Sequence, residues 1–579
     1  MPSDADASPS EPVQPAERRP SARASFGIGT GAGLAYGVLT LLALPLAGAS
    51  FDAVDSPPAS PAWFLGLLAP LPIAWLGWTA RRRWLAGLGV AIGSLPLWVA
   101  HHAWVSSVSF AGVFPLIAYL AVWPGLAAVG ISLARRRCGS IGPAVVVPTV
   151  WVALEFLRGE ILFGGYAWFL AGHPAIEFLP LARAAAAGGV PLVSWLVVAI
   201  GAVALAARYG SRSARRIGWA VSAVVIAAML SGWFRGSPES TRTVRIAAIQ
   251  TNVPQNNKQF PSPEQVAADF ADLLRLAERA AAEGAELLVT PETVFPGLAL
   301  DQDGADRAAG IYGDSINAYR DILLGSHREH GVPMLIGSLT RTGLEAVETE
   351  PGVRTIEWDR ILNSVYLLEG GGVMPVRYDK LRPMAFGETL PYIDAVPWLR
   401  DVVLRIGIGA SGMDFGLDRG TDRVVFGTPA GVVAAPICFE SSMAPVVRGL
   451  LSAGTDAGTP VELMVVMTND GWFGRFDAGR AMHLLQARWR CLETGLPMVR
   501  CANTGLSAIV ERDGSVAASL PARSEGVLLG EVGVGAAMTV YRRVGDAFGW
   551  ICLLLGAAAV GSGVGRRRAA RVSDSAGGV

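Results

Sequence analysis

Long apolar segments separated by arginine clusters constrain this chain more than any other feature. A helix needs about 20 mostly apolar residues to cross the hydrocarbon core of a bilayer. Segments of this kind lie near residues 26–49, 60–80, 84–106, 110–134, 141–158, 187–207, 216–234 and 545–564. The pattern predicts a polytopic α-helical membrane bundle with about eight spans, seven of them before residue 235.

Arginines recur at every second connection between these segments. The clusters are Arg18, Arg19 and Arg23; Arg81, Arg82 and Arg83; Arg135, Arg136 and Arg137; Arg208, Arg212, Arg215 and Arg216; and Arg566, Arg567, Arg568 and Arg571. Cytoplasmic loops hold the positive charge of membrane proteins. With eight spans, all five clusters lie in the cytoplasm. The segment 235–544 is then expected on the periplasmic side of a bacterial inner membrane.

Composition divides the chain into five parts. We expect a disordered cytoplasmic tail at 1–24, a seven-helix membrane domain at 25–234, an extracytoplasmic catalytic domain at 235–544, an eighth helix at 545–564 and a basic cytoplasmic tail at 565–579. Hydrophobic residues make up 51% of the chain and charged residues 17%, which is more apolar than one soluble domain needs. The formal net charge is zero, so nucleic acid is not an expected partner.

Strand and helix patterns alternate from Val244 onwards. The run 244–250 predicts a strand, and Ser262-Pro-Glu-Gln265 begins an amphipathic helix with a capping box. Asp513-Gly514 predicts a hairpin turn, and the acidic insertion 341–360 is expected to be an irregular surface loop. The alternation predicts a layered α/β domain.

A lone cysteine, Cys438, follows the apolar run 431–435, so a strand-to-helix elbow is expected there. Backbone N–H groups at a helix start can lower a thiol pKa towards neutrality and bind an oxyanion. A single cysteine is more often an inert core residue. Two other stretches favour a nucleophile.

Glu292 ends another short strand, and Lys380 follows a third, with Glu388 eight residues later. Taken singly, Glu292 could be a helix cap and Lys380 a solvated loop charge. Together with Cys438, in the order Glu, Lys, Cys, they resemble the nitrilase, or carbon-nitrogen hydrolase, superfamily. That resemblance implies a four-layer αββα sandwich. It also implies that Glu292 deprotonates Cys438, that Lys380 stabilises the oxyanion, and that Cys438 carries an acyl group as a thioester.

The chain from 26 to 564 resembles the bacterial apolipoprotein N-acyltransferases. The shared motifs are Thr-Pro-Glu292-Thr, Tyr378-Asp-Lys380, Phe386-Gly-Glu388, Ile437-Cys438-Phe-Glu440, Thr468-Asn-Asp-Gly-Trp-Phe-Gly474, His483-Leu-Leu-Gln-Ala-Arg488 and Gly165-Tyr-Ala-Trp168. The resemblance implies a phospholipid acyl donor and a diacylglyceryl lipoprotein acceptor within the lipid bilayer. Glu388 and Glu440 would position the lysine or the incoming amine, and Phe439 would line the acyl path. No cofactor and no metal are expected, and the protein is expected to be a monomer.

The chain also departs from that family's pattern. Arg382-Pro-Met-Ala385 replaces a usual histidine followed by Leu-Val-Pro, and a usual tryptophan is replaced near Gln259 and Phe260. These changes bear on the lid over the acyl pocket and so on lipid preference.

Several alternatives stay open from the sequence. The loop 158–174 is either an interfacial aromatic belt or, through Tyr166, Trp168 and His173, part of a lipid entrance. Cys491 and Cys501 are either paired or, as we favour, two buried thiols. The same chemistry would also suit a membrane-tethered amidase. A catalytically silent scaffold is the third alternative.

Overall fold

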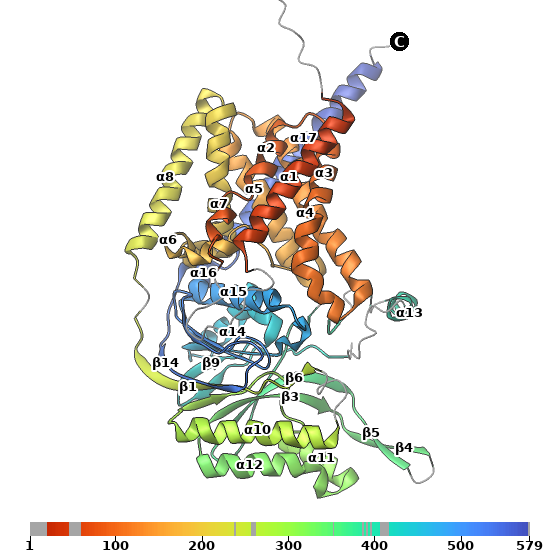
Figure 1. The fold of residues 1–579 in the computed structure, drawn as a ribbon, viewed down its shortest axis with the longest axis vertical. Helices are drawn as coiled ribbons and strands as arrows, with labels where there is room; N and C mark the ends of the chain where they lie inside the picture. Colours follow the sequence, from red (N-terminus) through yellow and green to blue (C-terminus); the bar gives the residue numbers. More distant parts are fainter. Residues whose placement is uncertain are drawn as a thin grey trace, which may run out of the picture.

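The chain is described by a computed structural model that covers residues 20–45, 60–236, 239–255, 262–350, 353–384, 387–389, 392–393, 396–405 and 416–576. Most of the tail expected at 1–24 lies outside these residues. In the basic tail expected at 565–579, no side chain is described. A helical bundle at one end of the molecule lies against an α/β domain at the other (Figure 1).

The bundle contains a helix in each predicted apolar segment. These helices are α1 (Ala22–Ala43), α2 (Leu71–Thr79) after the turn η1 (Trp63–Leu67), α3 (Arg83–His102), α4 (Phe110–Cys138), α5 (Pro143–Phe156), α7 (Ala185–Tyr209), α8 (Arg212–Phe234) and α17 (Ala547–Ala576). Within the described residues, five are long and apolar enough to cross a membrane, namely α1, α3, α4, α7 and α8. The eight spans therefore stay a prediction. Helix α5 ends at Phe156, where the chain continues as the π-helical turn η3 (Leu157–Ile161), which carries Arg158 and Glu160.

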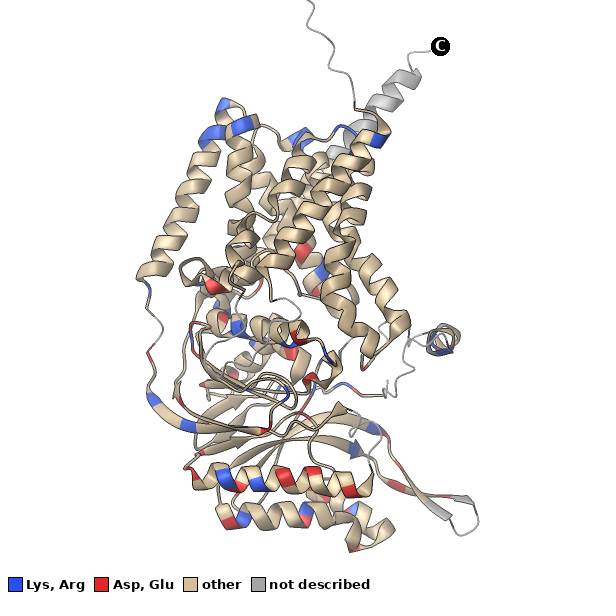
Figure 2. Ribbon diagram, viewed as in Figure 1, with Lys and Arg blue, Asp and Glu red and all other residues tan. Residues whose placement is uncertain are grey.

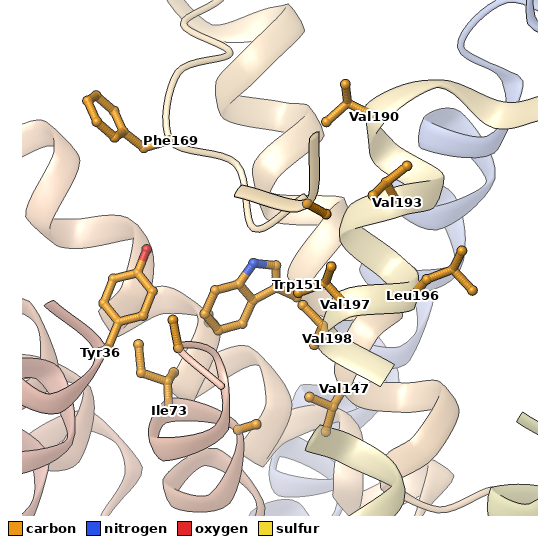
Figure 3. Close-up of a cluster of buried hydrophobic side chains, with 14 of the residues drawn as sticks. Tyr36, Ile73, Val147, Trp151, Phe169, Val190, Val193, Leu196, Val197 and Val198 are labelled. Atoms are coloured by element: carbon orange, nitrogen blue, oxygen red, sulfur yellow. The ribbon is translucent and has the colours of Figure 1, made fainter. Parts of the chain in front are cut away.

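Aromatic and β-branched side chains fill the centre of the bundle. Trp151 of α5 lies between Tyr36 of α1 and Val197 of α7 (Figure 3). The rings of Tyr36 and Trp151 meet edge to face, with centroids 5.9 Å apart. These contacts join helices that are distant in sequence.

Helices α1 and α3 approach closely through glycines spaced four residues apart. Gly29 and Gly33 of α1 face α3, and Gly89 and Gly93 of α3 face α1. A Cβ atom added at Gly29 would collide with the carbonyl oxygen of Ala86. Small residues at this spacing let helix backbones pack directly in a membrane.

We expect Gly29→Ala to destabilise the bundle by about 1–3 kcal/mol, because the added methyl group forces α1 and α3 apart. Gly31→Ala is the matched control, since nothing lies within 4 Å of its added Cβ. Thermal unfolding of both variants in detergent measures the difference. Equal stability of the two variants would contradict this packing.

Cationic residues gather at the helix ends far from the sheets (Figure 2). Arginines occupy the last turn of α4, the end of α7 and the start of α8. Helix α8 leads at its other end towards the first strand of the α/β domain. These arginines of α4, α7 and α8 and the α/β domain thus lie at opposite ends of the bundle.

Within the described residues, the α/β domain has two six-stranded sheets. The first has the order β14-β1-β2-β3-β6-β7 and the second β13-β12-β11-β10-β9-β8. The first contains β1 (Arg242–Gln250), β2 (Leu287–Val289), β3 (Met334–Thr342), β6 (Arg360–Glu369), β7 (Gly372–Asp379) and β14 (Gly526–Val534). The second contains β8 (Phe426–Thr428), β9 (Gly431–Ala434), β10 (Leu463–Thr468), β11 (Met498–Ala502), β12 (Ala508–Val510) and β13 (Val516–Ser519).

Side-chain alternation along β1 explains the layers. Ile246 and Ala248 pack into a core shared with the second sheet, whereas Ala247 and Ile249 pack against helices on the outer face. The outer helices are α10 (Pro263–Ala282), α11 (Gln302–Tyr312) and α12 (Ala318–His330). Helices α14 (Ala444–Asp456) and α15 (Asp477–Thr494) cover the second sheet. The result is the expected αββα sandwich, with α15 next to the bundle (Figure 1).

Local signals in the α/β domain were mostly reliable. The Ser262 hydroxyl accepts a hydrogen bond from the Gln265 N–H (3.2 Å), as the capping box predicts. The turn at Asp513-Gly514 joins β12 to β13, as predicted. The insertion 341–360 was wrongly expected to be irregular: it forms the hairpin β4 (Glu345–Glu350) and β5 (Val353–Glu357), because antiparallel pairing satisfies its backbone groups.

Ion pairs and hydrogen bonds join the helical bundle to the α/β domain. Arg183 pairs with Asp513 (3.2 Å), and Arg488 of α15 pairs with Glu177 (2.7 Å). The carboxylate of Glu493 accepts from the Val190 N–H of α7 (3.0 Å). The α/β domain is therefore held in a defined position below the bundle.

Candidate active site

Glu292, Lys380 and Cys438 come together at the ends of three strands. Glu292 follows β2, Lys380 directly follows β7, and Cys438 follows β9 at the start of the 3-10 turn η7 (Cys438–Ser442). Strands β2 and β7 belong to one sheet and β9 to the other, so the site lies where the two sheets meet. Strand ends hold such side chains rigidly while leaving them outside the sheet.

Lys380 bridges two carboxylates. Its ammonium donates to Glu292 Oε1 (3.2 Å) and to Glu388 Oε1 (2.8 Å), and only 1% of its side chain is exposed. Burial alone would lower the pKa of Lys380, but the two carboxylates outweigh this effect and raise the pKa well above its ordinary value. Glu388 Oε2 also accepts from the Met384 N–H (2.6 Å). Glu388 therefore ties the lysine to its own loop.

Glu292 is surrounded by donors. Asn363 Nδ2 donates to Oε1 (2.6 Å), and the Asn469 N–H donates to Oε2 (2.8 Å). Burial alone would raise the pKa of Glu292, but Lys380 and these two donors hold it below its ordinary value. Glu292 is thus a carboxylate at neutral pH and can accept a proton. Asn363 and Asn469 were not predicted from sequence, although Asn469 lies in a quoted motif.

Cys438 has a free, half-buried thiol and a left-handed backbone conformation, with φ at 54°. Burial and then the charge of Glu292 raise the pKa of its thiol, while Lys380 opposes them. The expectation that the helix start lowers this pKa was wrong. Cys438 begins a short 3-10 turn, and helix α14 starts only at Ala444, so burial and the carboxylate dominate. Proton removal must therefore accompany nucleophilic attack.

Glu440 connects the lysine loop to the cysteine elbow. Its carboxylate accepts from the N–H groups of Leu381 (2.7 Å), Arg382 (2.9 Å) and Ile437 (2.9 Å) and from the Tyr378 hydroxyl (2.8 Å). These four donors occupy the approximately four lone-pair sites of a carboxylate. Of the two roles expected for Glu440, positioning the lysine is compatible with this geometry, whereas direct contact with an incoming amine is not.

Aromatic side chains from the bundle cover the elbow. Phe439 stacks with Trp168, with centroids 6.2 Å apart, and with Tyr166, with centroids 6.5 Å apart. Trp168 is buried, and the Tyr166 hydroxyl is 2.7 Å from Nε2 of His102. His173 is also buried, against Trp489. Buried Trp168 and His173 do not fit an interfacial belt, and Trp168 reaches the nucleophile's neighbour.

The remaining sequence alternatives are partly resolved. Cys491 and Cys501 are free, buried thiols, as favoured from the sequence. Arg382 donates its backbone N–H to Glu440. Ala385, Gln259 and Phe260 lie outside the described residues.

Known protein families match both the α/β domain and the helical bundle of this chain. Residues 245–540 match the carbon-nitrogen hydrolase family, and residues 36–203 match the apolipoprotein N-acyltransferase N-terminal domain. The chain is similar to the apolipoprotein N-acyltransferase of Geobacter metallireducens, with 30% identity over 84% of each chain. The enzyme of the same name from Bordetella bronchiseptica is 30% identical over 89% of this chain and 96% of its own. An amidase structure from Nesterenkonia sp. has 18% identity and a TM-score of 0.34, covering 52% of this chain and 94% of its own.

Proposed function

This chain belongs to the apolipoprotein N-acyltransferase family, an acyltransferase family, and from that premise we propose its reaction. The protein transfers a fatty acyl chain from a membrane phospholipid to the N-terminal α-amine of diacylglyceryl-cysteine in lipoproteins. The acyl chain is carried between them as a thioester on Cys438.

One structural observation supports a lipid acyl donor independently of the family assignment. Trp168 and Tyr166, from the bundle, stack with Phe439, the residue after the nucleophile. The residue after Cys438 therefore belongs to an aromatic wall that continues into the bundle. An acyl chain entering from a bilayer would find such a wall favourable, whereas a small polar amide would gain little from it.

In the first step, Glu292 takes the proton of the Cys438 thiol as sulfur attacks the ester carbonyl of the phospholipid. Negative charge develops on the former carbonyl oxygen, and the Lys380 ammonium stabilises it. The intermediate collapses to the thioester. The lysophospholipid leaves as an alcohol, with the proton that Glu292 held.

In the second step, the neutral α-amine attacks the thioester carbonyl. Glu292 accepts a proton from the amine nitrogen and returns it to the departing Cys438 sulfur. The products are an amide and the regenerated thiol, so the kinetics are ping-pong. In this scheme Glu388 and Glu440 support the lysine, and Phe439 lines the acyl path.

We further propose eight spans, the division at 25–234, 235–544 and 545–564, and a monomer in the bacterial inner membrane. The catalytic domain faces the periplasm. Arginines at the helix ends far from the sheets support this orientation, because positive charge stays in the cytoplasm. Both substrates are confined to a bilayer, so attachment to its surface raises their effective concentration.

The test is intact-mass spectrometry of the purified full-length protein in detergent with a phospholipid. Wild type should gain a fatty-acyl mass that hydroxylamine removes and that a diacylated lipopeptide discharges. Cys438→Ser should not gain a hydroxylamine-sensitive adduct. Hydrolysis of small amides without any lipid adduct would instead favour the tethered amidase. Absence of both reactions would favour the silent scaffold.

A further inference from the structure

A buried histidine behind the nucleophile has no part in the steps above. His483 of α15 is 2% exposed, and its Nε2 is 3.2 Å from the carbonyl oxygen of Cys438. The Ser441 hydroxyl donates to the same oxygen (2.7 Å). This carbonyl thus has two side-chain partners in addition to the backbone around it.

The surroundings of Nδ1 determine where the ring carries its proton. Nδ1 is 2.9 Å from Asp470 Oδ1 and 3.1 Å from Arg500 Nη2, and Arg500 also donates to Asp470 Oδ2 (2.7 Å). If Arg500 donates to Nδ1, the neutral ring carries its hydrogen on Nε2. If the ring is charged, Nδ1 donates to Asp470 and Nε2 again carries a hydrogen. A neutral ring with its hydrogen on Nδ1 would instead place a lone pair of Nε2 3.2 Å from the Cys438 carbonyl oxygen, where two acceptors repel each other. We therefore assign a hydrogen to Nε2, which donates it to this carbonyl.

The backbone at Cys438 explains why this carbonyl needs support. A positive φ is uncommon for a residue with a side chain, and it persists only where the surroundings hold it. The orientation of the Cys438 carbonyl depends on the same backbone angles that aim the sulfur. Two donors on that oxygen therefore restrain the direction of Sγ.

We propose that His483, held by Asp470 and Arg500, is a positioning residue that keeps the Cys438 sulfur aimed at the acyl carbonyl. Asp470 and Arg500 are buried, and Asp470 also accepts from the Thr468 hydroxyl at the end of β10 (3.1 Å). The set therefore links the nucleophile to the rigid second sheet. The predicted effect on lipid acylation rests on the proposed function, whereas the effect on the thiol does not.

The test compares His483→Gln with His483→Asn in the full-length protein. A glutamine can place its amide N–H near the position of histidine Nε2, whereas an asparagine is too short. Two rates are measured: thioester formation with phospholipid, and alkylation of Cys438 by iodoacetamide. We expect asparagine to slow thioester formation roughly 100-fold, the scale of a misplaced reacting group, and glutamine to restore most of it. Alkylation should follow the same order.

His330→Gln is the matched control, because His330 lies in α12 on the opposite face of the sandwich. Unchanged rates in the asparagine variant would overturn the proposal. Equal losses in both His483 variants would do so too, since the ring would then only fill space. If alkylation follows the Gln and Asn order while wild type forms no lipid thioester, positioning stands and the proposed function fails.

A second variant covers the case in which His483→Asn does not fold. Ser441→Ala removes the other donor to the Cys438 carbonyl and leaves the buried charges in place. We expect both rates to fall several-fold in this variant. Unchanged rates would show that the carbonyl needs no support and would overturn the proposal.

Discussion

Replacing Lys380 by methionine is expected to reduce both stability and catalysis sharply. Lys380 Nζ is bonded to Glu292 and Glu388, so its removal leaves two carboxylates without their cation. Breaking a buried ion pair from one side costs about 3–5 kcal/mol. Loss of one group that stabilises an oxyanion lowers the rate about 10²–10³-fold. Unfolding in detergent and thioester formation measure the two losses separately.

Two variants serve as controls for Lys380→Met. Arg275→Met removes an exposed cation paired with Asp272 and Glu525, and should change stability little, because solvent screens exposed ion pairs. Adding Glu292→Gln to Lys380→Met removes one of the stranded charges. The double variant should recover part of the stability and none of the activity. A single variant as stable as Arg275→Met would contradict the ion-pair account.

The pH dependence of the stability of Lys380→Met provides a further test of the ion-pair account. In wild type the pKa of Lys380 is higher in the folded protein than in the unfolded chain, which stabilises the fold at any pH below about 10.4. The pKa of Glu292 is lower in the folded protein, which stabilises the fold at any pH above about 4.3. Neither contribution changes much between those limits. Without the ammonium, the pKa of Glu292 should rise above its unfolded value. The folded variant then binds protons more readily than its unfolded chain. The loss of stability relative to wild type should therefore become smaller as pH falls from about 8 to 5.

Local sequence patterns predicted the parts of the site that depend on local structure. Glu292 and Cys438 each follow a short apolar run, and Lys380 follows a more polar strand; the ends of such strands can meet. The Ser262 cap and the Asp513-Gly514 turn depend on a few neighbouring residues and were also predictable. The helix positions followed from apolar length alone.

Long-range partners could not be predicted in this way. Asn363 meets Glu292 across 71 positions of sequence, and Glu440 meets the Leu381 N–H across 59. The raised pKa of the Cys438 thiol depends on burial and on Glu292, which only tertiary structure supplies. The position of Trp168 against Phe439 likewise depends on how the bundle lies on the sandwich.

The second large effect is expected from Glu292→Gln, which should move two reactions of Cys438 in opposite directions. Thioester formation with phospholipid should fall about 10²–10⁴-fold, the usual contribution of a general base. Alkylation by iodoacetamide should become faster, because the negative charge of Glu292 raises the pKa of the thiol and glutamine lacks that charge. Alkylation expels iodide, which needs no proton, whereas a lysophospholipid must leave as an alcohol.

The amide of this variant also fits its surroundings poorly. Glu292 accepts from Asn363 and Lys380 through one oxygen and from the Asn469 N–H through the other. Glutamine has one oxygen, so its NH₂ group must face donors on one side. A buried donor left unpaired costs about 1–3 kcal/mol, which thermal unfolding should detect.

Glu286→Gln is the matched control, because Glu286 accepts the Arg245 N–H of β1 just before β2 begins, at the opposite end of β2 from Glu292. It should leave both reactions of Cys438 unchanged. If Glu292→Gln slows alkylation and acylation equally, the residue would serve chiefly to shape the pocket. If acylation is unaffected, the proton must go elsewhere. Only the opposite movement of the two rates identifies Glu292 as the group that carries the proton from the thiol to the leaving alcohol.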